Sequence, residues 1–116
     1  MPNQNTTVNF VLDPVANEDE YLPAVSTELI GNYPNPFNPE TTIAYSIKDR
    51  CKVRLEVYNL KGQLVRTLVN EEKANGHYKA VFNAKDEKGN TLSSGIYFYR
   101  LQAGNYVSTQ KMLLME

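Results

Sequence analysis

The sequence predicts an all-β protein, an antiparallel β-sandwich of the immunoglobulin-like or fibronectin-like kind with about seven strands. After residue 27, short segments in which apolar and polar residues alternate follow one another. Turn residues separate these segments at intervals of about 8–12 residues, the spacing of a sandwich. No segment is long enough to form a convincing helix. A chain of 116 residues can bury one core between two packed sheets.

We expect the chain to have two parts. Residues 1–27 have the composition of a linker and contain one short apolar run, Val8–Leu12. This run is either an additional edge strand or a strand that belongs to a preceding region. Asp13-Pro14 ends it, because proline lacks the backbone donor that a strand needs. Residues 28–116 are expected to form the sandwich.

The predicted domain begins with a proline-rich stretch, Tyr33–Pro39. Its three prolines forbid a helix and remove three backbone donors. Its two Asn-Pro pairs favour turns in which the asparagine side chain bonds to the nearby backbone. We therefore expect a rigid corner between two strands, with Phe37 as its apolar plug.

The strands that follow are recognised by residues that share one face. In residues 52–58, for example, Val53, Leu55 and Val57 alternate with charged residues. Residues 63–69 depart from this pattern, since Val65 and Leu68 lie three apart, and we expect a β-bulge there. Asn75-Gly76 predicts a turn, and the last strand is expected over residues 106–114. The expected core consists of Ile43, Tyr45, Ile47, Val53, Leu55, Val57, Tyr78, Phe82, Tyr97, Tyr99 and Leu101.

The composition argues against several functions. Twelve basic and 13 acidic side chains give a net charge of −1 without a basic stripe, which disfavours nucleic acid as a partner. Cys51 is the only cysteine, so no internal disulfide can form, and we interpret it as a small hydrophobe. No apolar run approaches the roughly 18 residues of a membrane-spanning helix. The first residues do not have the pattern of a signal peptide.

The titratable residues do not predict a catalytic or metal site. His77, the only histidine, falls on the expected outward face of its strand, and a Ser-His-Asp site would have to be built on it. The loop 86–90 does not follow the twelve-residue calcium pattern. We therefore expect no enzyme and no cofactor. Four of the eight tyrosines fall at core-facing positions, which favours packing over a carbohydrate platform. Tyr97 is a candidate tyrosine corner.

Three blocks stand out in the sequence: residues 29–43, residues 57–68, and residues 93–101 together with 109–114. They resemble the type IX secretion (Por secretion) C-terminal sorting domain family, type A, which is related to the immunoglobulin-like domain of flagellar hook-capping proteins. The resemblance covers residues 28–116. Two positions depart from the family: members often end in a basic residue rather than Glu116, and many carry tryptophan in place of Phe82.

The resemblance implies a non-catalytic sorting signal that directs an attached N-terminal passenger across the outer membrane of a Gram-negative bacterium. The implied partners are the outer-membrane type IX translocon and a sortase-like protease, which can remove the domain so that the passenger is anchored at the cell surface or released. The implied location is secreted or at the cell surface, by way of the periplasm. The implied recognition residues are Asn32, Tyr33, Pro34, Asn35, Pro36, Phe37, Asn38, Pro39, Gly95, Tyr97, Lys111, Met112, Leu113 and Leu114.

Several alternatives stay open at this point. If the last strand lies at a sheet edge, its main chain could pair with a receptor strand, with Lys111 setting the register, or could support weak self-association. Alternatively, Met112 and Leu114 only fill the core, and the Tyr33–Pro39 corner is only a structural turn. The rival functions are an immunoglobulin-like structural module, as in a flagellar protein, and a carbohydrate-binding or spacer module of a secreted glycosidase.

Overall fold

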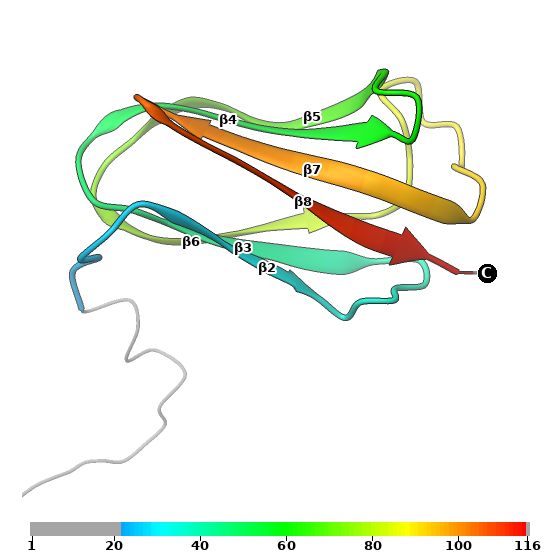
Figure 1. Ribbon diagram of the computed structural model, residues 1–116, viewed down its shortest axis with the longest axis horizontal. Coiled ribbons are helices and arrows are strands. Elements are labelled where there is room, and N and C mark those ends of the chain that lie inside the picture. Colours follow the sequence, from blue (N-terminus) through cyan, green and yellow to red (C-terminus); the bar gives the residue numbers. More distant parts are fainter. Residues whose placement is uncertain (1–21, 116) are drawn as a thin grey trace, which may run out of the picture.

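The computed structural model describes residues 22–115, and within this range the chain folds into two antiparallel sheets packed face to face (Figure 1). The described part has seven strands and no helix, which confirms the predicted sandwich. Val8–Leu12 and Glu116 lie outside the described residues. One sheet has the order β2 (Glu28–Tyr33), β3 (Thr41–Ile47), β6 (Gly76–Phe82); the other has the order β5 (Leu64–Lys73), β4 (Cys51–Asn59), β7 (Gly95–Ala103), β8 (Tyr106–Leu114).

The core forms where the inward residues of the two sheets meet. In β4, Val53, Leu55 and Val57 are completely buried, because side chains along a strand point alternately to opposite faces. The predicted core residues are all buried except Tyr78, which is half-buried. Tyr78 lies on β6, an edge strand of its sheet, and it stacks on the buried Tyr45 at 5.5 Å between ring centroids. Lys73 Nζ also lies over the Tyr78 ring, 5.0 Å from its centroid.

Strand β5 contains the predicted irregularity. Leu55 pairs with Val69 and the next residue, Glu56, pairs with Thr67, so that Leu68 has no partner in the ladder. A second shift leaves Val65 unpaired in the same way. Because β5 lies at the outer edge of its sheet, these bulges twist an edge that could otherwise pair with another chain.

The residues just before β2 also contact the sandwich. Ala24 is buried, and Ser26 and Thr27 accept hydrogen bonds from β3 and from the turn that follows it. The division of the chain between residues 27 and 28 stays a prediction. The contacts show that the last residues of the expected linker lie against the folded body.

Leu55→Ala is expected to lower the free energy of unfolding by about 2–5 kcal/mol, because it opens a cavity at a fully buried site between the sheets. Leu64→Ala is the matched control, since Leu64 is 52% exposed and its loss should cost less than about 1 kcal/mol. Urea denaturation with an unchanged m-value measures both. Equal effects of the two substitutions would contradict the described core.

Candidate functional site

The proline-rich corner projects a rim of exposed residues around one buried ring. Phe37 is only 1% exposed and packs against Phe82, with ring centroids 6.1 Å apart, which confirms its role as the plug. The peptide bonds before all three prolines are cis. The other residues of the corner, from Tyr33 to Pro39, are exposed, and Tyr33 is the most open of the large apolar residues there at 81%.

Side chains close the corner at its base. Asn32 Nδ2 donates to Thr41 Oγ1 at 3.1 Å and to the Pro34 carbonyl at 3.4 Å. Thr41 Oγ1 donates to the same carbonyl at 2.9 Å. These bonds join the end of β2 to the start of β3. They supply donors to a stretch in which prolines have none.

The corner is hydrogen-bonded to the C-terminal strand. The Phe37 N–H donates to the Leu113 carbonyl at 2.9 Å, and the Met115 N–H donates to the Phe37 carbonyl at 3.0 Å. The Leu113 N–H in turn donates to Asn35 Oδ1 at 3.0 Å. The corner and the final strand therefore form a short parallel pairing that crosses from one sheet to the other.

The third motif block lies at the same end of the molecule. In the ladder between β7 and β8, Gly95 is opposite Leu114 and Tyr97 is opposite Met112. Gly95 has a φ of +144°, a conformation that residues with a Cβ rarely adopt, although the space beside it is open. Glycine is therefore required here by the backbone. We call this cluster, formed by residues 32–39, 93–97 and 111–115, the motif end of the sandwich.

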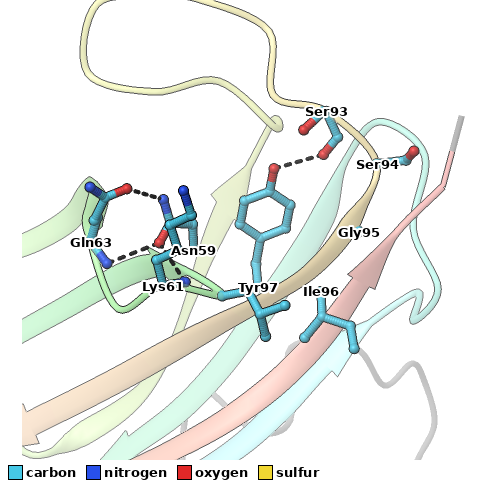
Figure 2. Close-up of a pocket in the computed structure, with 9 residues that line it drawn as sticks. Asn59, Lys61, Gln63, Ser93, Ser94, Gly95, Ile96 and Tyr97 are labelled. Carbon is cyan, nitrogen blue, oxygen red and sulfur yellow. Dashed lines mark hydrogen bonds between the residues drawn. The ribbon is translucent and has the colours of Figure 1, made fainter.

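Tyr97 has the hydrogen bond of a tyrosine corner. Its hydroxyl donates to the Ser93 carbonyl at 2.7 Å, as Figure 2 shows. The open pocket beside it has a volume of about 290 Å³ and is bordered by the turn between β4 and β5. Asn59 Oδ1 in this turn already accepts from the Lys61 and Gln63 N–H groups. This amide oxygen, in a residue that lines the pocket, is thus used to hold the turn.

A polar bridge spans the seam between β2 and β8. The Tyr99 hydroxyl lies 3.0 Å from Asn32 Oδ1 and 3.0 Å from Gln110 Oε1, so its proton is shared between two carbonyl oxygens. Gln110 Nε2 donates to the Leu29 carbonyl at 2.9 Å, and the Leu29 N–H donates to the Tyr106 hydroxyl at 3.0 Å. Burial raises the pKa of Tyr99 to about 12. Sequence reasoning missed Gln110 and Tyr106; a glutamine at an inward-facing position of the last strand was the available signal.

Strand β8 lies at the edge of its sheet, as the recognition hypothesis requires. In an antiparallel pair, alternate residues turn both backbone groups toward the partner strand and the next ones turn them away. Leu113 bonds to the corner on the side opposite β7, so Val107, Thr109 and Lys111 also direct their N–H and C=O groups outward. Their side chains are exposed, whereas Met112 and Leu114 are buried. The motif end covers the edge only near Leu113.

The remaining candidate groups do not form a second site in residues 22–115. His77 is exposed on β6, as expected, and Cys51 is half-buried against the core. No group of three or more metal-ligating side chains is found among these residues. In the same part of the chain, no helix has the length and apolar character needed to span a membrane.

The described residues thus form an immunoglobulin-like sandwich in which separate sequence blocks meet beside the edge strand β8. Residues 32–115 match the family described as the secretion system C-terminal sorting domain. The chain belongs to this family, and its role is that of a type IX secretion signal. Membership does not favour the flagellar or carbohydrate-binding alternatives. It implies export toward the outer membrane or the cell surface.

Two solved structures from Porphyromonas gingivalis contain a similar domain. Dimeric latent PorU superposes with a TM-score of 0.63 at 18% identity, over 92% of this chain and 10% of PorU. PorZ, described as an essential surface component of the type IX secretion system, gives 0.49 at 18% identity, over 87% of this chain and 12% of PorZ. The PorU likeness supports the fold. This chain spans only about a tenth of either protein. The search of curated proteins gives no match.

Alkaline pH is expected to destabilise the domain through Tyr99. The pKa of the Tyr99 hydroxyl is about 12 in the folded protein and about 10 in the unfolded chain. Below pH 10 this hydroxyl is therefore mainly protonated in both states. Between pH 10 and 12 the unfolded state loses a proton that the folded state keeps, and the free energy of unfolding falls by up to about 1.4 kcal/mol per pH unit. Urea denaturation at pH 9, 10 and 11 should therefore show a shallower decline for Tyr99→Phe. Tyr33→Phe, at an exposed position, should match the parent; an unchanged slope for Tyr99→Phe would contradict the assignment.

Proposed function

We propose that the domain is a removable, non-catalytic signal that brings an N-terminal passenger to the outer-membrane translocon and so to the cell surface or the medium. The main support for this proposal is that the motif blocks of the sequence meet at one end of the sandwich. The proline-rich corner and strand β8 lie far apart in the sequence, but they are joined by backbone hydrogen bonds at Phe37. A receptor can therefore test at one place whether the whole domain has folded.

The proposed recognition residues divide by exposure into two groups. Phe37, Tyr97, Met112 and Leu114 are buried and shape the motif end. The exposed group can touch a receptor directly, and it consists of Tyr33, Pro34, Asn35, Pro36, Asn38, Pro39, Lys111 and Leu113. Asn32 and Gly95 are half-buried and hold the backbone of the corner and of the β7 start. Both roles proposed for the corner, structural and recognition, are thus served by different residues of the same stretch.

Strand pairing is the physical mode of recognition that we propose. An extended receptor segment would add to β8 beside Val107, Thr109 and Lys111, where main-chain donors and acceptors face outward. The corner occupies the next positions of the same edge at Leu113. It therefore ends the accessible stretch and fixes the register in which the receptor strand pairs. The Lys111 ammonium favours an acidic residue on the incoming strand. The same edge would support only weak self-association between copies.

Removal of the domain by a sortase-like protease would separate it from the passenger, which is then joined to the surface or released. The domain itself supplies no catalytic group in this proposal. His77 and Cys51 lie on different sheets, and neither has a hydrogen-bonded partner of the kind that activates a nucleophile within the described residues. The protease and the translocon are the partners proposed for these steps.

The sorting role is tested by fusing the full chain to a reporter protein that carries an inner-membrane signal peptide. In cells with a type IX translocon, the reporter should appear on the surface or in the medium. In translocon-deficient cells it should stay in the periplasm. A reporter released equally by both cell types, or retained by both although the domain is folded, would contradict the proposal.

The pairing mode is tested by Thr109→Pro, which removes an outward-facing N–H without breaking the ladder with β7. Export of the fusion should fall at least about tenfold, because a receptor strand loses a hydrogen bond and meets the proline ring. Thr109→Ala keeps the backbone donor and should export normally. Thermal unfolding checks that each variant is folded.

Val107→Pro is a second edge variant in case Thr109→Pro does not fold. Ser108→Pro removes a donor that faces β7 and should unfold the domain. Normal export of a folded Thr109→Pro or Val107→Pro fusion would refute strand pairing at this edge, while the sorting role itself would stand.

A further inference from the structure

An asparagine side chain attaches the residues that precede β2 to the sandwich. Asn75 Oδ1 accepts from the Ala24 N–H at 3.2 Å, and Asn75 Nδ2 donates to the Ala24 carbonyl at 2.9 Å. Both backbone groups of Ala24 are thus paired, as they would be beside a neighbouring strand. Asn75 Nδ2 also donates to the Lys48 carbonyl at 2.8 Å, which joins the turn after β3 to the same point.

Two further contacts continue the attachment toward β2. Ser46 Oγ donates to the Ser26 carbonyl at 2.8 Å. The Lys48 N–H donates to Thr27 Oγ1 at 2.9 Å. Ala24 is 4% exposed, although the neighbouring Val25 side chain is 83% exposed. The main chain from Ala24 to Thr27 is therefore held while a large apolar side chain stays open to solvent.

The turn that contains Asn75 does not account for its side chain. Asn-Gly pairs are favoured in hairpin turns for their backbone conformation, and this explains the sequence at Asn75-Gly76. All three hydrogen bonds described for the Asn75 side chain, however, go to Ala24 and Lys48. None goes to its own turn. The amide is used as a connection between three segments that are distant in sequence.

We infer that Asn75 protects the segment Ala24–Thr27 from proteolysis by fixing Ala24 to the sandwich. A protease binds its substrate as an extended chain, so a segment whose backbone groups are already paired must open before it is cut. The scission that separates passenger from signal then takes place on the amino-terminal side of Ala24. This inference rests on the proposed removal of the domain, but the protection is a property of the isolated chain.

Thermolysin tests the protection directly, because it cuts before large apolar residues and Val25 is exposed. The full chain should resist cleavage between Ala24 and Val25. Asn75→Ala should be cut there about tenfold faster, which corresponds to about 1.4 kcal/mol of lost protection. Intact-mass spectrometry of the retained domain reports its first residue. Asn105→Ala, in the exposed turn between β7 and β8, is the matched control and should behave as the parent.

Two more variants keep the test decisive if Asn75→Ala fails to fold. Asn75→Asp keeps an acceptor for the Ala24 N–H and loses both donated bonds, so its cleavage rate should lie between those of the parent and Asn75→Ala. Thr27→Val removes one acceptor of the same segment without entering the core. Equal cleavage of parent and folded variants at Ala24-Val25 would overturn the inference. The assay needs no secretion apparatus, so a failed export experiment would leave its result unchanged.

Discussion

The main-chain pairing of Phe37 with Leu113 and Met115 is the interaction on which the rest of the structure depends. It joins a loop of the three-stranded sheet to the last strand of the four-stranded sheet. The buried Phe37 ring anchors that loop in the core beside Phe82. A backbone bond and a hydrophobic plug at the same residue therefore couple the position of the chain terminus to the packing of both layers.

This coupling divides the motif residues of this chain into two groups. Buried motif residues such as Phe37 and Met112 pack in the core, whereas exposed ones such as Tyr33 and Lys111 are those proposed to contact a receptor. Neither group can work alone, because exposed residues present a defined surface only if the buried ones fix the backbone. An unfolded domain would thus lack the surface that is proposed for receptor recognition.

Much of the fold could be predicted from alternation alone. The alternation of Val53, Leu55 and Val57 with charged residues predicts a half-buried strand. The three-residue spacing between Val65 and Leu68 predicts the irregularity that β5 contains. Alternation does not fix which strands become neighbours, so it could not place Gln110 under Leu29 or Asn75 beside Ala24. These contacts depend on how the two sheets are set against each other. The resemblance to the family indicated the motif residues, but only the structure shows that Asn35 and Leu113 are hydrogen-bonded.

The two ends of β2 lie at opposite ends of the sandwich. Ala24 enters beside the turns that follow β3 and β5, while Tyr33 leads into the corner at the terminus of β8 (Figure 1). Tension between a passenger at the first end and an anchorage at the second would run along the strands. The hydrogen bonds between neighbouring strands are perpendicular to that direction. They would therefore be loaded together in shear and would not break one at a time.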